Sequence, residues 1–465
     1  MTFESRRYDA IVLGSGQAGN PLAAALAAAG KTVAVIESTH VGGTCINDGC
    51  TPTKTMVASA RVAYLARRGV DFGVRTGPIG LDLGRVRERK RAMVQKSRGS
   101  NQKRLETTAG IDLIFGAGSF VDPHTVRVAP NDLSSERDLT SELIFINTGL
   151  RNQPPDVQGL SGVPCLDNVS IMELDEVPDH LLVLGGGYVG VEFSQMFRRF
   201  GSRVTIVQKS QQLLTREDQD IAEEVRKILI EDGIEVLLSA SVEQVSQRAD
   251  GQIQMNVRQD SGPCTLTGSH LLLAAGRTPN TGRLNLKAAG IDADEHGAIK
   301  VDDRLETTAP GIYALGDVKG GPAFTHISYD DFRIVRGNLL EGKQLSKAGR
   351  MLPYTVFIDP ELGRIGLTEA EARKQGLKIK VAKMPMSSVA RALEMDESRG
   401  VMKMIVDADT ELILGAAILG VYGGETASLI QIAMMGKLPY TALRDGIFSH
   451  PTLAESLNNL LQKFV

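Results

Sequence analysis

A glycine-rich unit that occurs twice in the chain constrains its fold more than any other feature. The first copy begins with a short apolar run, Tyr8 to Leu13, and continues through the turn Gly14-Ser15-Gly16-Gln17-Ala18-Gly19 into an alanine-rich helical stretch ending near Gly30. Lys31 to Glu37 then forms a second predicted strand. Such a βαβ unit places a pyrophosphate at the helix N-terminus. It predicts a dinucleotide site at Gly14, Gly16 and Gly19, with Glu37 accepting hydrogen bonds from a ribose diol. The alternative, a glycine turn without a ligand, leaves the coincidence of strand, turn, helix and acid unexplained.

The second copy has the same order of elements. Leu181 to Leu184 is a predicted strand, Val191 to Phe200 a helical stretch, and Arg203 to Val207 the closing strand. The turn between the first two, Gly185-Gly186-Gly187-Tyr188-Val189-Gly190, predicts a second nucleotide site at Gly185, Gly187 and Gly190. One chain with two such units is expected to bind two dinucleotides.

The two copies differ at the acidic position. Glu37 lies 23 residues after Gly14, whereas the residue 23 after Gly185 is the neutral Gln208, followed by Lys209. A carboxylate repels a 2′-phosphate, whereas Lys209 is able to pair with one, assisted by Arg216. We therefore predict NADPH rather than NADH at the second site, with NADH possible. The alternative is that Lys209 is a solvated surface charge.

Two further strand ends fit the same plan. Leu143 to Gly149 ends in Thr148 and Gly149, and Ile312 to Asp317 ends in an acid. The Asp317 carboxylate is expected either to bind a ribityl hydroxyl or to belong to a simple Gly-Asp turn.

Composition excludes several classes of partner. The chain has 465 residues, enough for about three domains of roughly 150 residues, and its 52 basic and 55 acidic residues nearly balance. We therefore expect no nucleic-acid partner, and interpret the basic helical stretch Leu83 to Leu105 as a solvated helix face. The apolar run Pro21 to Ala29 is too short to cross a bilayer, so no membrane contact is expected. Four cysteines do not make a disulfide scaffold, which favours a reducing cytoplasm.

Two of the four cysteines, Cys45 and Cys50, stand together just beyond the first glycine unit. This C-x4-C pair predicts a redox-active dithiol. A helical pattern starts near it and runs to about Arg68, and thiols at a helix N-terminus are expected to have lowered pKa values. Lys54 adds positive charge and is placed to contact a flavin ring. A zinc site is the structural alternative, but His40 is the sole additional ligand nearby.

Dithiol chemistry needs a proton acceptor, and the C-terminal segment offers His450 with Glu455 as its orienting acid. The same residues allow a second interpretation, because Thr452-x-x-Glu455 is also a capping box for the last helix. The sequence leaves both interpretations open.

Five motifs together, GGTCINDGCTPTK, GGGYVGVE, AAGRTPN, YALGD and HPTLAE, resemble the class I pyridine-nucleotide-disulfide oxidoreductases. This family of flavoprotein disulfide reductases includes dihydrolipoamide dehydrogenase, glutathione reductase and mercuric reductase. The resemblance implies FAD in the first site, a nicotinamide dinucleotide in the second and a C-terminal interface domain that makes a homodimer.

The resemblance also implies roles for individual residues. Cys45 corresponds to the interchange thiol and Cys50 to the charge-transfer thiol, while His450, oriented by Glu455, is the acid–base residue that reaches the dithiol of the other subunit. Glu192 matches a glutamate near the contact of flavin and nicotinamide. Gly276, in the AAGRTPN motif, is placed among the cofactor-binding residues.

Within the family, the stretches CTPTKT, GDVKGGPAFTHISYDDFRIV and HPTLAESLNNL resemble the mercuric-reductase-like branch for reactive-chlorine resistance. That branch is associated with reduction of copper(II) or hypothiocyanous acid. A typical mercuric reductase adds a C-terminal cysteine pair and an N-terminal metal-binding C-x-x-C domain. Neither is present here, and Leu461 to Val465 holds no cysteine, so efficient mercury detoxification is not expected. Gln208 similarly weakens the NAD-dependent dihydrolipoamide dehydrogenase alternative.

The predicted fold class is α/β, with two Rossmann-like dinucleotide-binding domains and a C-terminal α+β interface domain. The predicted segments are 1–150 and 277–349 for FAD, 151–276 for NAD(P), and 350–465 for the interface. The predicted function is transfer of electrons from NADPH through FAD and the Cys45–Cys50 pair to a small oxidant or soft metal ion such as Hg(II), with no resident metal. The alternatives are dihydrolipoamide dehydrogenase and, from another class, a redox sensor or metal-binding protein that uses the dithiol stoichiometrically.

Overall fold

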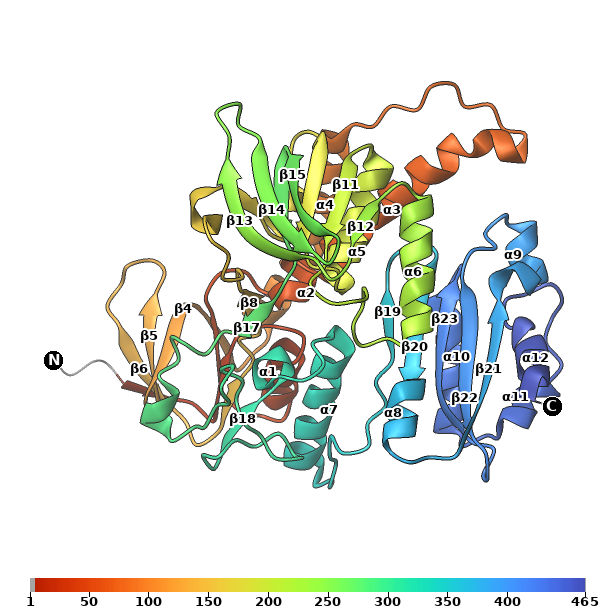
Figure 1. Cartoon of the computed structure of the whole chain (residues 1–465). Coiled ribbons are helices and arrows are strands. Elements are labelled where there is room, and N and C mark those ends of the chain that lie inside the picture. The colour runs from red at the N-terminus through yellow and green to blue at the C-terminus, as the bar shows by residue number, and fades with distance from the viewer. Residues whose placement is uncertain (1–4, 465) are drawn as a thin grey trace. The chain divides into compact units, whose positions relative to one another are not determined.

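The computed structural model describes residues 5–464 and divides into two compact units (Figure 1). The first contains the described residues up to Thr55 together with Glu88–Pro154 and Gly276–Arg350, and the second contains Met56–Arg87, Pro155–Ala275 and the described residues from Met351 onward. The four predicted domain segments therefore stay a prediction, and their outer ends, residues 1–4 and 465, lie outside the described part.

The first unit is built on an eight-stranded sheet. Its order is β1 (Ser5–Arg7), β6 (Arg137–Thr140), β5 (Thr125–Pro130), β4 (Ile111–Asp122), β3 (Val33–Glu37), β2 (Ala10–Leu13), β7 (Ile144–Ile146) and β18 (Ile312–Ala314). Neighbouring strands from β4 to β18 are parallel, whereas β4, β5 and β6 form antiparallel pairs. Residues of β2, β3 and β7 are buried throughout, as expected of parallel strands covered on both faces.

Two helices cover one face of this sheet. Helices α1 (Gly19–Ala28) and α7 (Thr325–Glu341) lie side by side, and their apolar residues share one core with β2, β3 and β7 (Figure 1). The short strands β8 (Leu150–Asn152) and β17 (Arg277–Pro279) form a separate antiparallel pair.

The second unit begins with a five-stranded parallel sheet in the order β12 (Glu235–Leu237), β11 (Arg203–Val207), β10 (His180–Leu184), β16 (His270–Leu273) and β9 (Cys165–Leu166). Helix α5 (Tyr188–Phe200) packs on β10 and β11, and α6 (Gln219–Glu231) packs on β12. An antiparallel three-stranded sheet joins β13 (Ser241–Gln247), β14 (Ile253–Gln259) and β15 (Gly262–Gly268).

The same unit holds an antiparallel five-stranded sheet in the order β19 (Tyr354–Val356), β20 (Glu361–Gly366), β23 (Ile413–Gly420), β22 (Val401–Asp407) and β21 (Ile379–Pro385). Helix α10 (Gly423–Met435) packs on β20 and β23. The shorter helices are α8 (Glu369–Lys374), α9 (Ala390–Glu394), α11 (Tyr440–Arg444) and α12 (Ser456–Leu461). A mixed sheet with a parallel βαβ part, a second parallel βαβ sheet and an antiparallel sheet with helices confirm the predicted α/β fold class.

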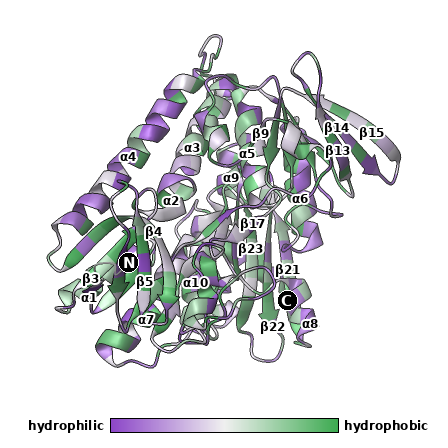
Figure 2. Ribbon diagram, turned by 90° about the vertical axis from the view of Figure 1, so that its left-hand side faces the viewer, coloured by the Kyte–Doolittle hydropathy of each residue, from purple (hydrophilic) through white to green (hydrophobic). Residues whose placement is uncertain are grey.

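Three helices lie between the two glycine units in sequence: α2 (Gly43–Asn47), α3 (Cys50–Arg67) and α4 (Leu83–Thr107). The helices predicted to end near Arg68 and to span Leu83 to Leu105 are thus confirmed within two residues. Much of α4 is hydrophilic (Figure 2), as the sequence indicated. None of the helices in residues 5–464 combines the length and apolar character needed to span a bilayer.

Candidate functional site

The first glycine turn has a geometry that only glycine permits. Gly14 has φ +95°, and a Cβ there would lie 2.4 Å from the Asn147 carbonyl oxygen. A Cβ on Gly19 would lie 2.2 Å from the Gly14 carbonyl oxygen. These close approaches of β2, β7 and α1 leave the helix N-terminus at the strand ends, where a pyrophosphate binds in such units.

Glu37 closes this turn from the end of β3. Its buried carboxylate accepts hydrogen bonds from the Ser15 backbone N–H at 3.0 Å, the Ser15 hydroxyl at 2.7 Å and the Thr39 N–H at 2.9 Å. A carboxylate offers about four acceptor positions, so one remains for a ribose hydroxyl. The Glu37 side chain is therefore fixed in position by hydrogen bonds from the glycine turn itself.

The second turn has a backbone geometry similar to that of the first. Gly185 has φ +114°, a Cβ on it would lie 2.6 Å from the Ala274 carbonyl oxygen, and a Cβ on Gly190 would lie 2.0 Å from the Gly185 carbonyl oxygen. Gly187 is extended, and no described atom lies within 4 Å of a Cβ placed on it. The open space beside Gly187 fits the close approach of a ligand.

Gln208 takes the structural place of Glu37. Its side-chain oxygen accepts a hydrogen bond from the Gly186 backbone N–H at 2.8 Å, as Glu37 does from Ser15. Lys209 and Arg216 are both exposed, and neither forms an ion pair with another described residue. Burial raises the pKa of Tyr188, the first residue of α5, and the charge of Arg216 opposes this rise, so Arg216 acts near the start of α5.

The cysteines lie on two consecutive short elements, Cys45 in α2 and Cys50 at the start of α3. Both are thiols, and they are hydrogen-bonded to each other. This hydrogen bond, followed by burial, raises the pKa of Cys45 strongly, against the lowering effects of Thr325 and Lys54. The prediction of a lowered pKa is thus wrong for Cys45, because the neighbouring thiol and burial outweigh the effects of Thr325 and Lys54.

His450 and Glu455 form a pair. The His450 Nδ1 lies 2.9 and 3.0 Å from the two carboxylate oxygens of Glu455, and the His450 side chain is 69% exposed. The Glu455 backbone N–H donates to the Thr452 hydroxyl at 3.2 Å, while α12 begins at Ser456. Glu455 is the N-cap residue of α12 and no side-chain hydrogen bond caps this helix, so the predicted capping box is not formed. The Thr452 hydroxyl instead closes the turn before α12, and the Glu455 carboxylate faces the imidazole.

The other residues predicted to bind a cofactor are Thr148, Gly149, Gly276 and Glu192. The Thr148 hydroxyl donates to the Asn280 carbonyl at 3.1 Å, and Gly149 has φ +68°. The Gly276 carbonyl accepts from the Gln153 N–H at 3.2 Å. The buried Glu192 accepts from the Phe357 backbone N–H at 2.8 Å, which ties α5 to the segment after β19.

Asp317 fits a ligand-binding role. Burial raises the pKa of its carboxyl group, and Arg277 and Lys319 oppose this rise. No other residue in the described part of the chain donates a hydrogen bond to this carboxylate, which leaves it available to a ribityl hydroxyl. Together with the glycine cradle and Glu37, this acceptor fits FAD.

Two residues of the first unit escaped prediction. Asn147 accepts a hydrogen bond from the Gly19 N–H at 2.9 Å and donates one to the Leu315 carbonyl at 2.8 Å, which joins the glycine turn to the end of β18. The Thr325 hydroxyl lies 3.3 Å from the Cys50 Sγ. Their sequence signals were only their positions next to Thr148 and inside the GGPAFTHIS stretch.

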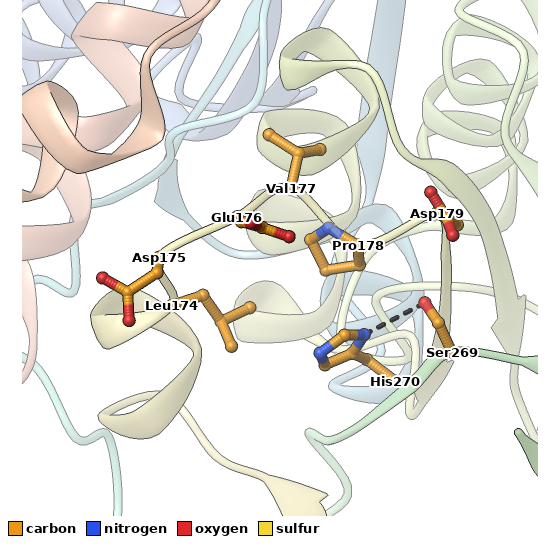
Figure 3. Close-up of a pocket in the computed structure, with 8 residues that line it drawn as sticks. All are labelled: Leu174, Asp175, Glu176, Val177, Pro178, Asp179, Ser269 and His270. Atoms are coloured by element: carbon orange, nitrogen blue, oxygen red, sulfur yellow. Dashed lines mark hydrogen bonds between the residues drawn. The ribbon is translucent and has the colours of Figure 1, made fainter. Parts of the chain in front are cut away.

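A hollow of about 310 Å³ in the second unit contains none of the predicted site residues (Figure 3). It is lined by Leu174, Asp175, Glu176, Val177, Pro178, Asp179, Ser269 and His270. The imidazole of His270 is hydrogen-bonded to the Ser269 hydroxyl, with 3.0 Å between Nδ1 and Oγ. Residues 5–464 contain no group of three or more His, Cys, Asp or Glu side chains arranged to hold a metal ion.

Known proteins resemble the chain along almost its whole length. Residues 8–331 match the family model for pyridine nucleotide-disulphide oxidoreductases, and residues 352–461 match the model for the dimerisation domain of the same family. The chain is 42% identical over 458 residues to the probable pyridine nucleotide-disulfide oxidoreductase RclA of Escherichia coli (strain K12), with 98% of each chain covered. It is 34% identical over 451 residues to a mercuric reductase of Bacillus cereus, with 97% of this chain and 70% of that protein covered.

Solved structures also resemble this chain. The Cu(II) complex of the HOCl-induced flavoprotein disulfide reductase RclA from Escherichia coli superposes with a TM-score of 0.89 at 41% identity. The superposition covers 98% of this chain and 99% of that one.

Proposed function

Because the chain belongs to the pyridine nucleotide-disulphide oxidoreductase family, whose members are FAD-dependent oxidoreductases, we propose that it is an NADPH-dependent reductase that acts through Cys45 and Cys50. The acceptor is a small oxidant or a soft metal ion, of which hypothiocyanous acid, Cu(II) and Hg(II) are the candidates. The observation that carries this proposal is the hydrogen bond between the Cys45 thiol in α2 and the Cys50 thiol at the start of α3. Two thiols in contact are able to close a disulfide and reopen it.

The first glycine unit supports FAD. Bound FAD supplies the exchange of an electron pair between a nicotinamide and a disulfide. The turn at Gly14 leaves backbone N–H groups for the pyrophosphate, and Glu37 keeps one acceptor position for a ribose hydroxyl. The Asp317 carboxylate is available to accept a hydrogen bond from a ribityl hydroxyl. Lys54 brings a positive charge next to the thiols.

The second unit supports NADPH. Gln208 closes the turn with an uncharged oxygen, so the 2′ position meets no carboxylate from this residue. The exposed Lys209 and Arg216 are left to pair with a 2′-phosphate.

The proton chemistry follows from the state of Cys45. Because its pKa is raised, Cys45 is a neutral thiol near pH 7 and needs a base before it attacks an electrophile. The Nδ1 of His450 faces the Glu455 carboxylate, and this contact favours the tautomer in which Nδ1 carries the proton and Nε2 is the acceptor. In the dimer, Nε2 then takes the proton from Cys45 of the other subunit. Oxidation of the dithiol by hypothiocyanous acid then yields the disulfide, thiocyanate, water and a proton.

A homodimer is supported by α10. Leu429, Ile432 and Met435 recur every three residues on its exposed face, while Ile430 and Ala433 on the opposite face are buried. This helix lies inside the matched dimerisation domain. We place the enzyme in the cytoplasm, where the dithiol state is maintained.

A panel of electron acceptors with NADPH tests the proposal. Wild type, Cys45→Ser, Cys50→Ser and the control Cys264→Ser are compared for NADPH oxidation with hypothiocyanous acid, Cu(II) and Hg(II). We expect either active-site substitution to abolish turnover and the control to retain it. Equal rates in all four proteins would refute the dithiol route. NAD reduction by dihydrolipoamide alone would instead identify a dihydrolipoamide dehydrogenase, and absence of any turnover would indicate a stoichiometric sensor.

A further inference from the structure

The segment between β11 and α6 carries both charges proposed for the 2′-phosphate, and its middle packs on the second glycine turn. The Leu214 N–H donates to the Gly186 carbonyl at 2.9 Å, and a Cβ on Gly186 would lie 2.4 Å from the Leu213 side chain. Leu214 has φ +45°, a left-handed conformation that is rare outside glycine. Both leucines are buried. The glycine turn therefore fixes the path of the chain between Lys209 and Arg216.

Glu217, the residue after Arg216, anchors the end of this segment. Its fully buried carboxylate accepts a hydrogen bond from the Tyr354 hydroxyl and lies 3.9 Å from the Nε of Arg364, whose side chain is also buried. Tyr354 and Arg364 lie opposite each other on the antiparallel strands β19 and β20. Burial raises the pKa of the Glu217 carboxyl group, and Arg364 and the Tyr354 hydroxyl oppose this rise. The exposed Arg216 is thus next to an acid that is held inside the protein.

Tyr354 also contacts the helix that follows the second glycine turn. Its ring lies against that of Tyr188, the first residue of α5, with 5.4 Å between the ring centroids. Three residues after Tyr354, the Phe357 N–H donates to Glu192 of the same helix at 2.8 Å. One side chain therefore joins the start of α5 to the residue that follows Arg216.

We propose that Tyr354 is a positioning residue for nucleotide choice, which acts through Glu217 to hold Arg216 beside the 2′-phosphate of NADPH. This inference rests on the proposed function. Arg216 has a long, exposed side chain, and a backbone that is already fixed reduces the entropy lost when this side chain binds a phosphate. Without the Tyr354 hydroxyl, Arg364 remains beside Glu217 at 3.9 Å, which is too long for a hydrogen bond. The position of Glu217, and of Arg216 next to it, is then less well defined.

The test measures the binding of two nucleotides to the FAD-loaded enzyme by titration calorimetry. Adenosine 2′,5′-bisphosphate carries the 2′-phosphate, and 5′-AMP lacks it. Tyr354→Phe removes the hydroxyl and keeps the ring, and we expect it to bind the bisphosphate about fivefold more weakly, the effect of one lost hydrogen bond, and 5′-AMP as the wild type does. Tyr440→Phe, the same change at a buried tyrosine on α11, is the matched control and is expected to bind both nucleotides as the wild type does.

A double-mutant cycle determines whether Tyr354 acts through Arg216. Arg216→Ala should weaken binding of the bisphosphate, and Tyr354→Phe added to it should cause no further loss, because the group that Tyr354 positions is then absent. Additive losses would overturn the proposal, and so would an equal loss of affinity for both nucleotides in Tyr354→Phe alone. Glu217→Gln, which removes the charge and keeps the volume, replaces Tyr354→Phe with the same expected result if that variant does not fold.

The wild type separates this inference from the proposed function. Equal affinity of the wild type for the two nucleotides would refute the proposed NADPH preference and this inference with it. A wild type that prefers the bisphosphate, together with a Tyr354→Phe variant that keeps the same preference, would refute this inference alone.

Discussion

Replacement of Lys403 by methionine probes a deeply buried cation in the segment that matches the dimerisation domain. Its side chain on β22 is 3% exposed, and its Nζ lies 2.8 Å from Glu369, 3.0 Å from Asp220 and 3.1 Å from Asp218. Removing one partner of a buried ion pair costs about 3–5 kcal/mol when the remaining charge stays buried. Of the three carboxylates, the Asp218 side chain is 6% exposed, whereas those of Glu369 and Asp220 are 26% and 35% exposed. We therefore expect Lys403→Met to lose about 3 kcal/mol at pH 7, the lower end of that range.

The structure provides a matched control. Lys383 lies directly opposite Lys403 on β21 and contacts the same Asp220 at 3.1 Å, but its side chain is 41% exposed. An exposed pair contributes about 0.2–1 kcal/mol, so Lys383→Met is expected to change stability by less than about 1 kcal/mol. Equal losses in the two variants would refute the argument from burial.

The pH dependence of this effect has a definite sign. The hydrogen bond from Lys403 lowers the pKa of Glu369, and contacts with Glu369 and Asp220 raise the pKa of Lys403 despite the opposing effect of burial. The carboxylate's contribution is present above its unfolded pKa and is lost as the pH falls through its lowered folded pKa. The lysine's contribution is present below its unfolded pKa and is lost as the pH rises through its raised folded pKa. The cluster therefore stabilises the protein from about pH 4 to about pH 10.

The stability difference between wild type and Lys403→Met should consequently narrow as the pH falls below about 4, through the lowered pKa values of the carboxylates. Because the chain contains no tryptophan, thermal unfolding is best followed by circular dichroism or calorimetry. A difference that stays constant as the pH falls below about 4 would contradict the ionic origin of the effect.

Two further predictions concern assembly and nucleotide choice. Ile432→Glu, which places a charge on the 67% exposed apolar side chain of α10, should convert a dimer into monomers in light scattering; an unchanged mass would remove α10 from the interface. Lys209→Glu should raise the KM for NADPH at least about tenfold and leave that for NADH nearly unchanged, since a charge-assisted contact contributes about 1.5–3 kcal/mol; parallel changes in both KM values would contradict a 2′-phosphate contact.

The sequence predicted those parts of the site that depend on local spacing. The two glycine turns were predictable because Gly14, Gly19, Gly185 and Gly190 lie at fixed distances from a strand and a helix, and backbone sterics allow no larger residue there. The helix beginning at Cys50 followed from periodicity in the same way.

Other features depend on residues brought together by the fold. Thr325 contacts a cysteine 275 positions earlier, and Asn147 binds an N–H 128 positions away, so no local pattern indicates either contact. The pKa of Cys45 was predicted wrongly because the rule that a helix N-terminus lowers a thiol pKa treats each thiol separately. In the structure the second thiol, Cys50, has the largest effect on the pKa of Cys45. The choice at Glu455 was open because its backbone N–H and its carboxylate bind different partners.

The internal repeat separates the structural demands on a nucleotide turn from the demands of its ligand. In both copies the first glycine N–H donates to the closing strand, at 2.8 Å to Ile36 and 2.9 Å to Val207, and the next N–H donates to the side chain 23 positions after that glycine. An amide oxygen accepts this second bond at 2.8 Å as well as a carboxylate does at 3.0 Å. Closing the turn therefore requires an acceptor but no charge. The difference between Glu37 and Gln208 removes one negative charge from the second site and leaves its backbone unchanged, which is the alteration that a 2′-phosphate requires.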